Sequence, residues 1–419
     1  MAIPKKDLDE LLHANVITPQ TVWDIEQYYL TKKQQQANPL LAIFAALGGI
    51  LVGLGIILIF AHNWDNFSRQ VKTILAFTPL LLSQAFAAYC IIKNKSVAFK
   101  ETAAVLVFFS VGASISLVAQ IYNISGDFPK FLLTWALLCA PVMYLLRSNA
   151  VVVLHLIMAV VYVVNKSLWK YPYEEPYWYL ALIAIVLPYY YSLIKNDPEG
   201  RMTRVLHVLM PTSFIIAATT FFSHTGNFSL LLFMVFFGLL YLLGKLPQLS
   251  RVYTFVGITG LSVIMFVGSF RDMWNLFMNK ISAGYIVVFV LMILGIVFMI
   301  FRNLKKKDTD PVQFLSVTLL LVYVLSVLSP AFAAVVTNLL ALATGLWYIR
   351  KGIHKLNYPL VNFGLIIITI LAGCRFFDTD LSFVVRGLLF VGVGAGFFVA
   401  NYTVSKRKQQ TLKPQPHEN

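Results

Sequence analysis

Long apolar runs separated by short polar stretches occupy almost the whole chain beyond Pro39. A run of about 20 apolar residues can cross about 30 Å of hydrocarbon as an α-helix. Inside a bilayer a helix is also favoured because its backbone groups bond within their own segment. We therefore predict an all-α, polytopic transmembrane bundle of about 14 spans, over residues 39–61, 71–92, 101–122, 130–146, 149–165, 177–194, 203–223, 228–244, 251–270, 281–301, 312–328, 331–349, 358–374 and 382–401.

Two of these runs are longer than a single span requires, and each contains a break. Residues 130–165 are interrupted at "RSN" around Arg147, and residues 312–349 at Ser329–Pro330. We therefore divide each run into two spans.

The two ends of the chain are polar. Residues 1–36 predict a short cytosolic helical head of two helices, in which Thr18 is the N-cap and Pro19 the first helical residue. Residues 403–419 form a basic cytosolic tail, and residues 37–402 form the transmembrane bundle. The head is expected either to pack against the bundle or to bind a protein partner.

The basic residues predict an orientation. The chain has 33 Lys and Arg residues against 18 acidic ones, a net charge of +15. With both termini cytoplasmic, 24 of the 33 fall on cytoplasmic segments. The other nine are Arg69, Lys72, Lys130, Lys166, Lys170, Arg271, Lys280, Arg375 and Arg386. This positive-inside bias explains the charge by topology, so no nucleic-acid partner is expected.

The first half of the bundle contains a repeated sequence pattern. Three successive hairpins within 39–196 each have a polar cluster at the end of the outgoing helix and a proline in the returning helix, at Pro79, Pro141 and Pro188. The pattern suggests duplicated hairpins. The prolines are either harmless kinks or breaks that frame a cavity, as in many transporters.

Several motifs that would indicate catalysis are absent from the sequence. It contains no P-loop, HExxH or GxSxG motif and no paired metal-binding cluster. We expect no cofactor and no metal, no catalytic residue can be assigned, and whether the protein is an enzyme stays open. Gly392 and Gly396 form a small-xxx-small pair, which predicts close helix contact within the chain or between protomers.

Two polar clusters follow apolar runs at the predicted outer face. The first, in "FAHNWDNFSRQ", contains His62, Asn63, Trp64 and Asp65, and the second contains Gln120, Tyr122, Asn123 and Asp127. The carboxylates of Asp65 and Asp127 could instead accept hydrogen bonds at a helix end, or pair with the nearby Arg69 or Lys130. We predict that the two clusters form walls of one polar, substrate-binding pocket.

These motifs also carry a family resemblance. The head "VITPQ", the "HNWD" cluster and the "QIYNISGD…LLTW…P…YLLRS" block resemble a bacterial family of predicted membrane proteins known as domain of unknown function 2157. The resemblance covers about residues 7–165. It implies a multi-pass protein of the bacterial cytoplasmic (inner) membrane, and it implies no activity.

Other polar residues lie within or beside the spans. Arg386 lies inside the last span, where a charged side chain is costly unless it is paired or snorkels. It is expected to pair with Asp378, Asp380 or Asp65, or to bind an anion as part of the site. His155 and His207 are expected to be hydrogen-bonded interior residues, and the aromatic residues of 165–179 to be interfacial anchors.

Three functions are compatible with this pattern. The favoured hypothesis is a transporter or lipid flippase with a polar pocket at the extracytoplasmic face. The alternatives are an integral-membrane enzyme acting on a lipid-linked substrate, and a non-catalytic scaffold or sensor that binds a partner through residues 1–36. The expected partners are membrane lipids and an anionic small molecule or lipid head group.

Overall fold

A computed structural model describes residues 12–14, 16–25, 27, 64–167, 174–226, 228–274, 283–306, 310–376 and 383–412. The chain divides into two compact units, residues 1–77 and 78–419, which are considered separately. All regular secondary structure in the described ranges is helical. The predicted all-α class is therefore confirmed for this part of the chain.

The first unit contains a short helix at residues 19–25. The Thr18 hydroxyl accepts a hydrogen bond from the backbone N–H of Thr21 at 3.2 Å, which confirms the predicted N-cap. A 3₁₀ turn, η1 (Trp64–Asn66), precedes α4 (Arg69–Ile92), which continues into the second unit. The predicted first span, 39–61, lies outside the described residues.

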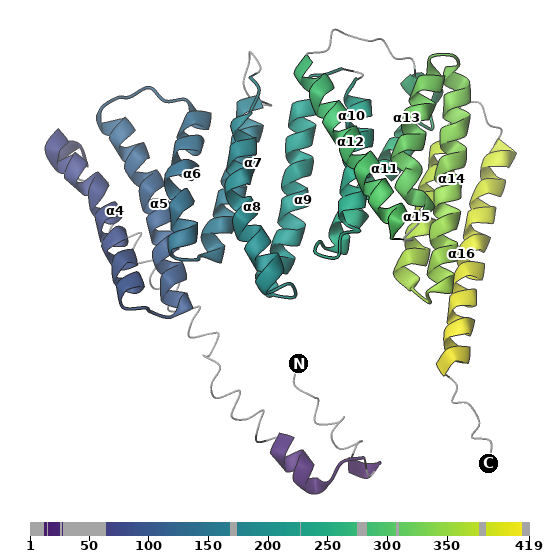
Figure 1. The fold of residues 1–419 in the computed structure, drawn as a ribbon, viewed down its shortest axis with the longest axis horizontal. Helices are drawn as coiled ribbons and strands as arrows, with labels where there is room; N and C mark the ends of the chain where they lie inside the picture. The colour runs from purple at the N-terminus through teal and green to yellow at the C-terminus, as the bar shows by residue number, and fades with distance from the viewer. Residues whose placement is uncertain are drawn as a thin grey trace. The chain divides into compact units, whose positions relative to one another are not determined.

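The second unit is a succession of helices (Figure 1). They are α5 (Val97–Ile121), α6 (Phe128–Leu145), α7 (Asn149–Ser167), α8 (Trp178–Asn196), α9 (Arg201–Phe222), α10 (Phe228–Leu243), α11 (Arg251–Val267), η2 (Arg271–Trp274), α12 (Ala283–Lys305), η3 (Pro311–Phe314), α13 (Leu315–Ser326), α14 (Pro330–His354), α15 (Tyr358–Phe376) and α16 (Phe383–Leu412). Every predicted run from 71–92 onward coincides with a helix. Both predicted breaks are confirmed, because α7 begins at Asn149 and the Ser329 hydroxyl caps α14.

Nine helices of the described part are long and apolar enough to cross a membrane: α4, α5, α6, α7, α8, α9, α12, α14 and α15. Three apolar segments are shorter: α10, α11 and Pro311–Ser326. At 1.5 Å per residue, the 16 residues of α10 extend about 24 Å. The helices are those of a membrane protein, while the count of fourteen spans and the orientation of the termini remain predictions.

Neighbouring helices pack as antiparallel pairs, so the connections alternate between two ends of the unit (Figure 1). We call the end with the connections after α5, α7 and α9 the Glu175 end, because Glu175 precedes α8 there. The other end, with the connections after α10 and α12, is the Asp310 end. In the predicted orientation the Glu175 end is extracytoplasmic.

Two large apolar cores and two smaller clusters lie among the described residues of the second unit. One large core joins α4 to α9, and the other joins α10 to α15. Both draw on α10 and α11, which pack closely on each other. A Cβ added at Gly257 of α11 would lie 2.3 Å from the Tyr241 backbone nitrogen, so the absence of a side chain permits this contact.

The prolines of the repeated hairpin pattern lie inside continuous helices. Pro79 is in α4, Pro141 in α6 and Pro188 in α8, and α9 contains a fourth, Pro211. None of the four helices ends at its proline. The geometry therefore agrees with the interpretation of these prolines as tolerated residues within helices.

Candidate functional site

A pocket of about 390 Å³ opens between α8, α9, α10 and α12. It reaches from the Glu175 end to Phe236, in the middle of α10. Seven of the 13 lining residues are aromatic, and the full lining is Glu175, Tyr177, Tyr179, Leu180, Phe214, Ala217, Ala218, Phe221, Phe222, Phe236, Gly284, Tyr285 and Val288. This volume and lining are typical of small-molecule sites.

The apolar wall of the pocket is well packed. The ring centroids of Phe222 and Phe236 are 6.2 Å apart, and those of Tyr177 and Phe221 are 6.3 Å apart. On the rim, Leu180 is 61% exposed and Val288 is 42% exposed. Apolar side chains on a rim between membrane helices would face hydrocarbon, so the pocket can admit a molecule from the lipid phase.

The polar atoms of the pocket centre on one carboxylate. The Tyr285 hydroxyl donates to Glu175 Oε1 at 2.5 Å and also lies 3.0 Å from the carbonyl oxygen of Phe221. Glu175 Oε2 is buried and has no hydrogen-bond partner among the described residues. The neighbouring Glu174 forms an ion pair with Lys166. Glu175 thus presents a bare carboxylate oxygen, which is costly to bury without a cation or donor.

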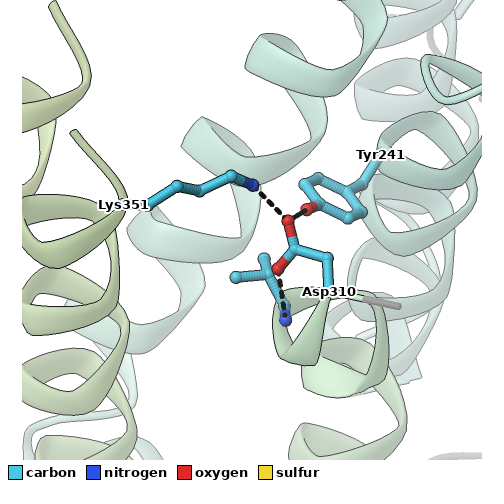
Figure 2. Close-up of polar contacts among 4 residues, drawn as sticks. Tyr241, Asp310 and Lys351 are labelled. Atoms are coloured by element: carbon cyan, nitrogen blue, oxygen red, sulfur yellow. Dashed lines mark hydrogen bonds and ion pairs between the residues drawn. The ribbon is translucent and has the colours of Figure 1, made fainter. Parts of the chain in front are cut away.

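A second polar site lies at the Asp310 end (Figure 2). Asp310 Oδ2 pairs with the Lys351 ammonium of α14 and accepts a hydrogen bond from the Tyr241 hydroxyl of α10 at 3.2 Å. Asp310 Oδ1 accepts from the backbone N–H of Val312 at 3.1 Å, so the carboxylate also caps η3. One buried carboxylate therefore connects three elements of the second core.

Further polar side chains are buried in the elements around Asp310. Lys245, just after α10, places its ammonium 5.6 Å from the centre of the Tyr241 ring. Gln313 of η3 and Asn303 of α12 are 1% and 3% exposed. Neither atom of the Gln313 amide has a hydrogen-bond partner in the described residues. The interior at this end is therefore polar as well as charged.

The electrostatics of Asp310 predict a pH dependence of stability. Burial alone would raise the pKa of Asp310, but the hydrogen bond and the charge of Lys351 hold it below its usual value. A carboxylate whose pKa is lower in the folded than in the unfolded state stabilises the fold at pH values above its unfolded-state pKa, which is about 4. This stabilisation is lost as the pH falls through the folded-state pKa. We expect unfolding measured between pH 6 and about 3 to show this loss, and Asp310→Asn to show a smaller one.

The two predicted interior histidines are confirmed as hydrogen-bonded core residues. His155 Nε2 lies 3.1 Å from the Leu182 carbonyl oxygen. The His207 Nδ1 atom lies 2.5 Å from the Tyr190 hydroxyl, which is 3.2 Å from the Tyr253 hydroxyl. These contacts tie α7 to α8, and α8 to α9 and α11.

The predicted binding residues are only partly described. His62 and Asn63 lie outside the described residues, whereas Trp64 and Asp65 form part of η1, where the Lys72 ammonium lies 5.6 Å from the Trp64 ring centre. In the second unit, Gln120, Tyr122 and Asn123 are exposed where α5 ends, and Asp127 precedes α6. Because the two clusters belong to different units, their shared pocket stays a prediction.

The arginines behave differently from one another. Arg386 is in α16, and its side chain lies outside the described residues, as do its predicted partners Asp378 and Asp380. Arg375 donates to the Ser269 carbonyl oxygen at 2.8 Å and stacks on Phe270, with 5.0 Å between guanidinium and ring centre. Arg375 thus fixes the segment after α11, which gives it a structural role.

Sequence reasoning did not single out Glu175 or Asp310 as site residues. Glu175 lies in the aromatic stretch that was interpreted as an interfacial anchor. Asp310 lies in a basic connection, but it precedes Pro311, and an aspartate before a proline is typical of a helix start. That signal identifies the cap, but it does not reveal the contacts with Lys351 and Tyr241.

Comparison with known proteins gives a family match over part of the chain. Residues 9–152, which are 144 of the 419, match a family model described as "Predicted membrane protein (DUF2157)". The resemblance drawn from residues 7–165 is thereby confirmed. No curated protein and no solved structure matches the chain. The match ends before Glu175 and Asp310, so any role for these residues must be argued from geometry.

Proposed function

We propose that this membrane protein is a transporter or lipid flippase, and that the pocket between α8, α9, α10 and α12 receives its amphiphilic substrate. The supporting observation is the pocket itself. An aromatic cavity of about 390 Å³ with an apolar, exposed rim contains a carboxylate oxygen of Glu175 that has no hydrogen-bond partner among the described residues. Such a cavity suits a molecule with an apolar body and a polar head.

The position of the pocket supports movement of the substrate as well as binding. The lining of the cavity extends from Glu175 to Phe236 of α10. Five residues further along α10, about 7.5 Å at 1.5 Å per residue, Tyr241 binds the Asp310–Lys351 pair. A cavity that reaches only the middle of α10, with buried polar contacts beyond its inner limit, fits one state of an alternating-access cycle.

The proposal predicts protein-dependent movement of lipid between leaflets. Liposomes containing the protein and trace fluorescent phosphatidylethanolamine or phosphatidylglycerol, with and without a membrane potential, are treated with dithionite, which bleaches only the outer leaflet. We expect wild-type protein to expose inner-leaflet label faster than protein-free liposomes do. Val288→Trp, which fills the pocket from its exposed rim, should return the rate close to the protein-free value.

The matched control is Val297→Trp, the same exchange on the same helix. Val297 is 55% exposed and does not line the pocket, so this variant should keep the wild-type rate. Equal activity of the two variants would remove the pocket from the transport path. No movement of either lipid above the protein-free rate would overturn the flippase proposal.

A further inference from the structure

We infer that the pocket selects amphiphiles whose head is a protonated or quaternary amine. This inference rests on the proposed function and adds the chemical class of the substrate. Three features of the pocket favour such a head: its charge, its unpaired acceptor atom and its aromatic surfaces.

The charge of the pocket has one sign. Among the described residues that line it, Glu175 is the one with a charged side chain, and its carboxylate is fixed at Oε1 by the Tyr285 hydroxyl. An anionic head in this cavity would meet that carboxylate in an apolar surrounding, where repulsion is weakly screened. A cationic head would be attracted to it for the same reason.

The unpaired oxygen of Glu175 favours a substrate head that supplies a hydrogen-bond donor or a positive charge. Glu175 Oε2 is buried without a hydrogen-bond partner in the described part of the chain. An ammonium group carries up to three donors and a full positive charge, so it can satisfy this oxygen directly. A quaternary ammonium group lacks donors, so its interaction with this oxygen would be purely electrostatic.

The aromatic rings offer a second contact for a cation. Tyr177, Tyr179 and Tyr285 line the same cavity as Glu175, and Phe221 contacts both the Tyr177 ring and the Tyr285 hydroxyl. Aromatic faces attract cations, and surfaces of this kind recognise quaternary ammonium ligands. The remaining Phe and Ala side chains provide an apolar wall for the tail.

The neighbouring acidic residue supplies a matched control. Glu174 is adjacent in sequence, but it pairs with Lys166 and does not line the pocket. Glu175→Gln and Glu174→Gln therefore remove the same charge at adjacent positions, one inside the pocket and one outside it. An effect of overall surface charge would be the same in both variants.

The test uses tetraphenylphosphonium and tetraphenylborate, two ions of nearly equal shape and opposite charge. Binding is measured by equilibrium dialysis against protein in dodecyl maltoside, a neutral detergent without amines. We expect wild-type and Glu174→Gln protein to bind the cation saturably and to reject the anion. Glu175→Gln should weaken cation binding at least tenfold, and Val288→Trp should abolish it.

Three outcomes would overturn the inference, and the first of them separates it from the proposed function. Cation affinity unchanged by Glu175→Gln, with binding still lost in Val288→Trp, would leave an amphiphile pocket without charge selection. No binding of either ion by wild-type protein, or binding that Val288→Trp leaves intact, would remove the pocket from both proposals.

A competition arm identifies the source of the amine head. Phosphatidylethanolamine carries an amine, whereas phosphatidylglycerol with the same acyl chains does not. Selective displacement of tetraphenylphosphonium by phosphatidylethanolamine would assign the pocket to an amine-headed lipid. Displacement by dodecyltrimethylammonium but by neither lipid would assign it to a single-chain cation from outside the bilayer, and both results support the inferred class.

Discussion

Replacing Asp310 by alanine should lower the free energy of unfolding by about 3–5 kcal/mol, the usual cost of breaking a buried ion pair from one side. The Asp310 side chain is 8% exposed and that of Lys351 is 27% exposed. Alanine would leave the Lys351 ammonium without its carboxylate and would remove the acceptor of the Tyr241 hydroxyl and the Val312 N–H. Because Lys351 can turn partly toward solvent, we expect a value near the lower limit.

The measurement is equilibrium unfolding in mixed micelles, followed by circular dichroism. Glu199→Ala provides the control, because Glu199 is an exposed carboxylate in the connection between α8 and α9 at the same end of the unit. An exposed charge contributes about 0–1 kcal/mol, so this variant should resemble the wild type. A loss in Asp310→Ala no larger than that in Glu199→Ala would contradict the buried network.

A second substitution separates charge pairing from packing. If the cost of Asp310→Ala arises from an unpaired cation, adding Lys351→Met should recover much of the lost stability. If the cost arises from the lost cap of η3 and the lost Tyr241 contact, the double variant should be no more stable than the single one. The losses of stability in Asp310→Ala alone and in Lys351→Met alone are added, and their sum is the value expected for the double variant if the two residues did not interact.

The helices could be predicted from the sequence because each depends on its own residues. An apolar run of sufficient length specifies a membrane helix without information from the rest of the chain. The breaks at Arg147 and at Ser329–Pro330 are equally local, since each is a helix end with its own polar residues or proline. These are the features that the structure confirms.

The two polar sites could not be predicted because they depend on contacts between distant residues. Glu174 and Glu175 are chemically identical and adjacent, yet one pairs with Lys166 of α7 and the other meets Tyr285 of α12. Asp310 meets residues 69 positions before it and 41 positions after it. Hydropathy carries no information about such pairings, so the packing of the helices had to be known first.

The glycines illustrate the same limit within the membrane. The Gly392/Gly396 spacing predicts close helix contact, but a Cβ at either position would meet no atom of the described residues within 4 Å, so contact between protomers stays a prediction there. In the described part of the second unit, single glycines such as Gly244, Gly257 and Gly364 lie where an added Cβ would overlap a backbone atom of a neighbouring segment. A spacing pattern shows that a contact is sterically permitted, whereas the rest of the fold decides which glycine makes it.

Replacing Gly257 by alanine should therefore destabilise the protein, although alanine is the better helix former by about 1 kcal/mol. The added Cβ would lie 2.3 Å from the nitrogen and 2.6 Å from the Cα of Tyr241, and 2.7 Å from the Phe237 carbonyl oxygen. These are backbone atoms of α10, so the overlap cannot be relieved by a side-chain rotation. Overpacking of this kind costs about 1–3 kcal/mol or more, and we expect a net loss of about 2 kcal/mol by equilibrium unfolding.

Gly295→Ala is the matched control, because Gly295 lies inside α12 and a Cβ there meets only Leu239 Cδ1, at 3.4 Å. This variant should be neutral or slightly stabilising.

Because α10 carries both Phe236 of the pocket and Tyr241 of the Asp310 network, moving it should also weaken tetraphenylphosphonium binding in Gly257→Ala. Stability and binding equal to those of Gly295→Ala would show that α10 and α11 are further apart than described. A loss of both would tie the pocket to the packing of this helix pair.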